Sequence, residues 1–159
     1  MLKRMLMWIR RWTFNLFPPY FGTGARVLRI SPDWREVTVK LPLSVRTRNI
    51  VGTTFGGSMY AAVDPVYMMM LIRLLGPSYI VWDKAACIRF LKPGRGTLFA
   101  VFRIDETELD AIRMALDSRH SIDRSYHVDL VDAAGIVHAS VEKTVYIRRR
   151  HEAATPVAA

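Results

Sequence analysis

Hydrophobic and polar residues alternate along much of the chain, and this period of two predicts strands. Residues 25–31 and 35–43 carry such patterns on either side of the turn Pro32-Asp33, so they predict a β-hairpin. Further strands are predicted over 79–91, 97–105, 125–132 and 136–147. Small residues at 133–135 would join the last two strands as a second hairpin.

Three segments have helical patterns instead. Residues 2–16 place apolar side chains at helical spacing with basic residues mainly on the other side, and Pro18-Pro19 ends this segment. Residues 58–75 form a long, almost wholly apolar run that predicts a helix buried on every side, and residues 106–120 predict a polar helix. The order of elements predicts an α+β fold in which one antiparallel sheet wraps a long central helix.

The length of 159 residues suits one domain. We expect an amphipathic helix over 1–20, the domain over 21–148 and a flexible tail over 149–159. Because Arg10 and Arg11 interrupt the first apolar run, we expect a retained segment and a cytoplasmic protein. Residues 1–17 could pack on the domain or a second subunit, or could make peripheral contact with an anionic membrane.

Composition narrows the classes of partner. Hydrophobic residues make up 51% of the chain, enough for a packed core, and the net charge of +9 favours an anionic partner. Nucleic acid is not expected, because the aromatic residues are not interleaved with basic ones on one face. The single cysteine, Cys87, excludes an internal disulfide, and the four histidines lack metal-ligand spacing.

The candidate chemistry lies between Asn49 and Asp64. Gly56 and Gly57 begin the apolar helix, where exposed backbone N–H groups could stabilise a developing oxyanion. Asp64 places a carboxylate within the apolar run, which is costly unless the group is paired or used. Pro65 predicts a kink beside it, so Asp64 could alternatively satisfy backbone groups that the kink exposes.

These residues resemble a known family. The pattern Asn49…Gly52-Thr53-x-Phe55-Gly56-Gly57 followed by Asp64, with the later strand and turn DKAACIRFLKPGRGT, is similar to hotdog-fold acyl-CoA thioesterases of the phenylacetyl-CoA-pathway type. Within these it resembles the branch called thioesterase-like or tetrameric acyl-CoA thioesterase. The resemblance covers residues 17–147 and implies a dimer or a dimer of dimers.

The resemblance also implies roles for individual residues. Asp64 matches the family's catalytic carboxylate, acting as general base on water or as nucleophile. Gly56 matches the glycine whose N–H polarises the thioester carbonyl, with Gly57 beside it. Asn49 matches the asparagine that positions water or substrate, and Asp83 falls where relatives often carry a serine or threonine near the attacking water.

One position departs from the family pattern. Relatives commonly have histidine where this chain has Phe55, which removes a polar group that helps orient the thioester and argues against dehydratase chemistry. Arg89, Lys92 and Arg95 flank a turn and could bind the phosphates of coenzyme A. Lys84 could pair with Asp83 or, across a subunit interface, with Asp64.

Helix geometry adds an expectation about assembly. Eight residues of helix separate Gly56 from Asp64, about 12 Å at 1.5 Å per residue. A reacting carbonyl must lie close to both the attacking group and the oxyanion donor. We therefore expect Gly56 of one subunit to work with Asp64 of another, at the interface of an obligate homo-oligomer.

The sequence thus predicts hydrolysis of an acyl-CoA to a free acid and coenzyme A, with no metal or redox cofactor. Two alternatives stay open, the first because of Phe55. One is a non-catalytic module that binds acyl-CoA or lipid and is docked to a membrane by the N-terminal helix. The other is a purely structural subunit, which would show neither binding nor turnover.

Overall fold

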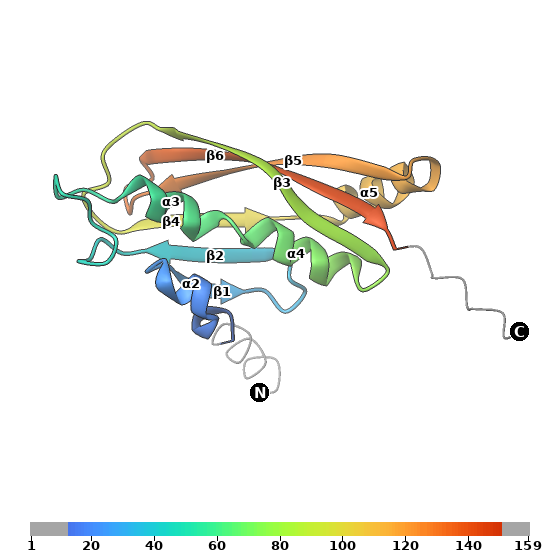
Figure 1. Ribbon diagram of the computed structural model, residues 1–159, viewed down its shortest axis with the longest axis horizontal. Helices are drawn as coiled ribbons and strands as arrows, with labels where there is room; N and C mark the ends of the chain where they lie inside the picture. Colours follow the sequence, from blue (N-terminus) through green and yellow to red (C-terminus); the bar gives the residue numbers. More distant parts are fainter. Residues whose placement is uncertain (1–12, 151–159) are drawn as a thin grey trace, which may run out of the picture.

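A computed structural model describes residues 13–150 of the chain. Its elements are, in chain order, α2 (Pro18–Gly22), β1 (Arg26–Ile30), β2 (Glu36–Leu41), α3 (Gly56–Val63), α4 (Val66–Leu75), β3 (Tyr79–Phe90), β4 (Leu98–Arg103), α5 (Glu106–Ser118), β5 (Ser121–Val131) and β6 (Val137–Arg149). α3 and α4 lie across one face of a single sheet (Figure 1). This confirms the predicted α+β architecture.

The sheet has six strands in the order β1-β2-β4-β5-β6-β3, and each neighbouring pair is antiparallel. Both predicted hairpins, β1–β2 and β5–β6, are present. Strand β3 pairs only with β6 and therefore forms one edge of the sheet. The inward-facing residues of β6, among them Val141, Val145 and Ile147, are completely buried against the helices.

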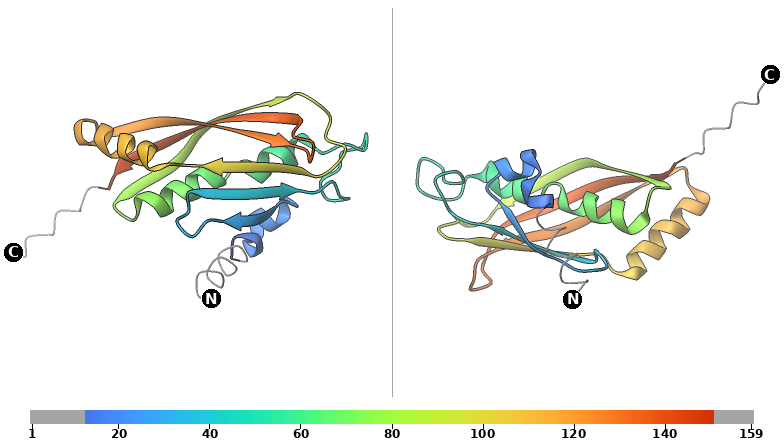
Figure 2. Two further views of the ribbon diagram at one scale, coloured as in Figure 1. Left: turned by 180° about the vertical axis from the view of Figure 1, so that it is seen from behind. Right: turned by 90° about the horizontal axis from the view of Figure 1, so that it is seen from below.

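The long central helix is interrupted where the sequence predicts a kink. α3 ends with Asp64 as its C-cap, and α4 begins after Pro65, which cannot donate an N–H to the preceding turn. One side of the helix pair faces the sheet, as two further views show (Figure 2). Ala62 and Met70 are fully buried. The expectation of burial on every side is wrong, because Ile72 is exposed.

The segment Gly56–Leu75 is long and apolar enough to cross a membrane by length and composition alone. In this structure it instead forms α3 and α4, whose apolar residues join the sheet in one hydrophobic core. Burial against the sheet therefore accounts for the apolar composition without a lipid environment.

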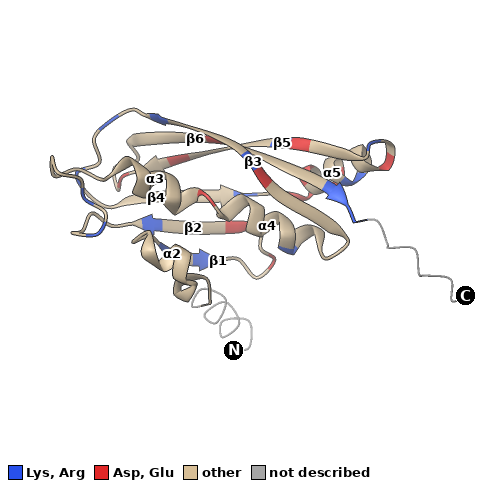
Figure 3. Ribbon diagram, in the orientation of Figure 1, with Lys and Arg blue, Asp and Glu red and all other residues tan. Residues whose placement is uncertain are grey.

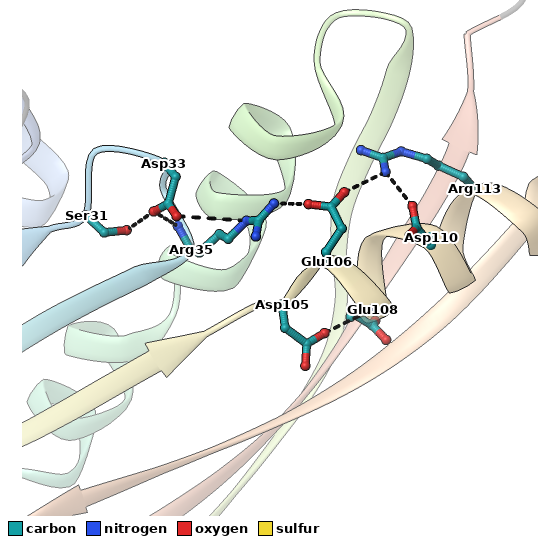
Figure 4. A network of polar contacts seen from close by, with 8 residues as sticks. All are labelled: Ser31, Asp33, Arg35, Asp105, Glu106, Glu108, Asp110 and Arg113. Atoms are coloured by element: carbon teal, nitrogen blue, oxygen red, sulfur yellow. Dashed lines mark hydrogen bonds and ion pairs between the residues drawn. The ribbon is translucent and has the colours of Figure 1, made fainter.

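The predicted polar helix is α5, which lies at the end of the sheet remote from α2 (Figure 1). Its N-cap, Asp105, accepts a hydrogen bond from the N–H of Glu108, as Ser, Thr, Asp and Asn commonly do at this position. Arg35, just before β2, pairs with Glu106, and Glu106 also pairs with Arg113 two turns further along the helix (Figure 4). These contacts tie α5 to the β1–β2 hairpin.

The ends of the chain differ from expectation in detail. Residues 13–16 are helical and α2 follows from Pro18, but most of the predicted N-terminal helix lies outside the described residues. Strand β6 extends to Arg149, so this first residue of the expected tail belongs to the sheet. The remainder of the predicted tail, from 151 onward, also lies outside the described residues.

Candidate functional site

A pocket of about 430 Å³ opens at the N-terminal end of α3. Its lining comes from the loop before α3, the first turns of that helix, and the connection that follows β3. The lining residues are Asn49, Thr53, Thr54, Gly56, Met59, Phe90, Leu91, Lys92 and Pro93. Three residues predicted from the sequence, Asn49, Gly56 and Lys92, therefore share one pocket.

Hydrogen bonds fix the loop that enters α3. Oδ1 of Asn49 accepts from the N–H groups of Val51 and Thr53 at 3.1 and 3.0 Å, and its Nδ2 donates to the Thr53 hydroxyl at 2.9 Å. Thr54 fastens the loop to the β3–β4 connection, since its N–H donates to the Gly94 carbonyl at 2.8 Å. Asn49 thus shapes the loop, and its role toward water or substrate stays a prediction.

The first turn of α3 has no side-chain cap, because its N-cap residue is Phe55. The initial N–H groups of a helix have no partner within the helix, so those at Gly56 and Gly57 are available to a ligand. A Cβ at Gly56 would lie 2.8 Å from the ζ carbon of Phe90, and one at Gly57 would lie 2.4 Å from the Phe55 ring. Glycine at both positions lets the two aromatic rings approach the backbone.

The carboxylate of Asp64 belongs to a second cluster, at the other end of α3. Lys143 Nζ lies 2.7 Å from Asp64 Oδ1, and the Tyr60 hydroxyl donates to the same oxygen at 2.6 Å. Lys143 Nζ also lies 3.1 Å from Oδ2 of Asp83 on β3. The lysine side chain is 1% exposed, whereas that of Asp64 is 43% exposed. Asp64 is therefore held from inside the protein and open on its other side.

Asp83 reaches this cluster at an irregularity in β3. The register with β6 shifts between Asp83 and Ala85, a bulge that re-aims side chains at an edge strand. Burial raises the pKa of Asp83, and the charge of Lys143 only partly offsets that effect. Its Oδ1 is the one fully buried side-chain oxygen or nitrogen without a hydrogen-bond partner among the described residues.

Lys143 is itself a charged group held by its neighbours. Burial alone would lower the pKa of its ammonium, but the hydrogen bonds and charges of Asp64 and Asp83 together raise that pKa. Lys143 is therefore protonated at neutral pH. The cluster therefore has two carboxyl groups, those of Asp64 and Asp83, for a single ammonium group.

Within the described chain, the lysine that contacts both carboxylates is Lys143. Lys84 pairs with Asp123 on β5, not with Asp83. The signal for Lys143 is present in the sequence, because it falls in phase with the inward apolar residues Val141 and Val145 of β6. A charge at such a position must have a partner inside the fold.

The structure keeps the two parts of the predicted site separate. Asp64 is not among the residues that line the pocket at Gly56, which agrees with the distance expected along the helix. Arg89 and Arg95 are exposed near the pocket but do not line it. Basic residues follow the β3–β4 connection and the loop before α3 at this end of the molecule (Figure 3).

Comparisons with solved structures identify the fold. Protein PA5026 from Pseudomonas aeruginosa, described as a probable thioesterase, superposes with a TM-score of 0.79 at 18% identity, covering 89% of this chain and 95% of its own. Thioesterase HI1161 from Haemophilus influenzae gives a TM-score of 0.66 at 13% identity, with 86% and 87% covered. At such identities the likeness establishes the fold alone.

A third structural neighbour is a phenylacetic acid degradation protein, and at 20% identity it supports the fold but does not establish the predicted phenylacetyl-CoA branch. An asparagine-to-aspartate variant of the phenylacetic acid degradation protein PaaI from Thermus thermophilus has a TM-score of 0.56 at 20% identity, covering 81% of this chain and 97% of its own. Together these neighbours confirm the hotdog fold. No curated protein matches the sequence significantly.

A protein-family model matches most of the chain. The family described as a domain of unknown function, DUF4442, matches residues 7–147, which include every element from α2 to β5 and nearly all of β6. The chain is therefore a hotdog-fold member of the DUF4442 family.

Proposed function

We propose that this protein is a thioesterase that hydrolyses an acyl-CoA to a free acid and coenzyme A. The observation that carries the proposal is the Asp64 carboxylate, gripped at Oδ1 by Lys143 and Tyr60 and open to solvent on its other side. A fixed, partly exposed carboxylate suits a general base or a nucleophile. Structural neighbours described as thioesterases support the reaction class.

The N-terminal end of α3 supplies the complementary group. Its uncapped N–H groups at Gly56 and Gly57 would stabilise the oxyanion that forms when the thioester carbonyl is attacked. Lys92 at the pocket wall, with Arg89 and Arg95 nearby, would bind the phosphates of coenzyme A. The chemistry needs a carboxylate, backbone donors and water, and calls for no cofactor beyond the coenzyme A of the substrate.

A complete site requires a second subunit in this proposal. Gly56 and Asp64 lie at opposite ends of α3, so one chain does not bring both to a single carbonyl. The free edge of β3 suits subunit pairing, because it is 12 residues long and exposes the small residues Ala85, Ala86 and Cys87. Long unpaired edges of this kind are normally covered by another strand. Pairing there would form the homodimer, from which a dimer of dimers could assemble.

A second candidate function is binding of acyl-CoA without hydrolysis. Phe55 favours it, since this side chain is 56% exposed beside the pocket and offers no polar group to orient a thioester. The same pocket would then hold a ligand that Asp64 does not attack.

Thiol release from a panel of acyl-CoAs tests the proposal, using acetyl to palmitoyl chains and aryl thioesters such as phenylacetyl-CoA. Wild type is compared with Asp64→Asn, and the control is Asp110→Asn, an exposed carboxylate on α5. Turnover that collapses in Asp64→Asn alone supports the thioesterase. Equal activity in all three proteins rules out Asp64, and calorimetric binding without turnover supports the binding module.

A further inference from the structure

Lys143 is an unusual residue for its position. It points inward from β6 between the fully buried Val141 and Val145, in a strand face that is otherwise apolar. Replacing a buried ion pair by well-packed apolar side chains is often neutral or stabilising, so stability alone is a weak reason for an ammonium here. The carboxylates that Lys143 contacts suggest a functional reason for its presence.

The contacts distinguish the two oxygens of Asp64. Both the Tyr60 hydroxyl and the Lys143 ammonium bind Oδ1, at 2.6 and 2.7 Å. Within residues 13–150, Oδ2 accepts no hydrogen bond, and it is not enclosed. Two donors on one oxygen fix the rotation of the carboxylate and leave the lone pairs of the other oxygen free.

Lys143 is in turn fixed from two elements, β3 and α3. Asp83 on β3 holds its ammonium at 3.1 Å, Asp64 holds it from the end of α3, and the Tyr60 ring centroid lies 5.6 Å away. A further titratable group, Tyr126 of β5, is paired with Lys143 in the sheet and stacks on the core residue Tyr67. The ammonium therefore has a defined place and cannot act as a mobile surface charge.

We propose that Lys143 is a positioning residue, which with Tyr60 holds Asp64 by Oδ1 so that Oδ2 is the atom presented to water or to the thioester. The role in turnover rests on the proposed function, whereas the orientation of Asp64 can be observed without it.

The main variant is Lys143→Met, which keeps side-chain length and removes the charge, with Lys143→Arg as the conservative variant. Lys84→Met is the matched control, because this lysine on β3 pairs with Asp123 away from the cluster. We expect kcat to fall about 10- to 100-fold in Lys143→Met with KM changed much less, since misplacing a reacting group affects the chemical step.

Partial rescue of kcat by Lys143→Arg, with Lys84→Met resembling wild type, would support the positioning role. Wild-type kcat in a folded Lys143→Met protein would overturn it and leave the thioesterase proposal intact. If the wild type hydrolyses no acyl-CoA, the proposed function fails instead. The crystal structure of Lys143→Met then decides: rotation of the Asp64 side chain supports the inference, and an unchanged carboxylate overturns it.

Discussion

Among single residues, Asp83 combines burial with incomplete hydrogen bonding. One of its oxygens contacts Lys143 and the other has no partner, so ionisation costs more in the folded chain than in the unfolded one. The pKa of Asp83 is accordingly raised from 3.8, with burial as the main cause. Its contribution to stability is fully present below the unfolded pKa and is lost as the pH rises through the folded pKa.

Asp83→Asn should remove this dependence on pH. We expect the melting temperature of the variant, relative to wild type, to rise as the pH increases from about 4 to about 7, because the amide carries no ionisation cost. Calorimetric scans across that range provide the measurement, with the exposed Asp123→Asn as control. A relative melting temperature that falls with pH would show that attraction to Lys143 outweighs burial.

At Gly56, adding even a methyl group should lower the activity strongly. A methyl group there would lie 2.8 Å from the Phe90 ring, which is exposed enough to move aside at little cost in stability. In the proposed reaction the methyl would crowd the carbonyl away from the N–H donors, so Gly56→Ala should lower kcat/KM about 100-fold. Gly22→Ala, where a Cβ meets nothing within 4 Å, is the control for steady-state kinetics. Activity equal in both variants would contradict this placement of the oxyanion.

Among the elements, α5 depends on its cap and not on intrinsic helix stability. Its buried face is narrow, with Leu109, Ile112 and Leu116, and the opposite face is charged. Asp105 follows the end of β4 and starts this helix by accepting the Glu108 N–H at 2.8 Å. Isolated helices of this length are marginally stable in water, so loss of the cap should lower the stability of the whole domain.

Asp105→Ala should destabilise the protein by about 1 kcal/mol, the usual cost of losing an N-cap side chain. For a domain of this size that corresponds to a fall in melting temperature of about 2–4 °C. Asp110→Ala on the same helix removes only an exposed ion pair with Arg113 and should have a smaller effect. Equal losses in the two variants would mean that charge, and not capping, stabilises this helix end.

At the scale of the whole molecule, the arrangement of α3 and β3 decides how a site could be completed. Mixing two inactive variants tests whether Gly56 of one subunit and Asp64 of another form one active site. In a heterodimer of Asp64→Asn with Gly56→Leu, a shared site would combine the intact Gly56 of one chain with the intact Asp64 of the other. We expect mixed subunits to regain about half the activity per dimer that wild type has. No recovery, with heterodimers verified by native mass spectrometry, would place both groups in one chain.

Features that depend on neighbouring residues could be predicted from the amino-acid sequence. Period-two patterns predicted the strands, Gly56 marked the start of the central helix, and Asp64-Pro65 marked its kink. Each follows from local backbone geometry, which a short segment expresses without the rest of the fold. Lys143 was missed, although a lysine in phase with apolar residues is a local signal of the same kind. Its partners, by contrast, have no local signal.

Contacts between groups far apart in the sequence became known from the folded structure. Asp64 and Lys143 are 79 positions apart, and the choice of Lys143 over Lys84 depended on the bulge in β3 and on the register of β6. Likewise, the exposed side of α4 and the free edge of β3 follow from the order of strands in the sheet. Such pairings are set by packing across the whole domain, where burial makes an unpartnered charge costly and so selects the partner within reach.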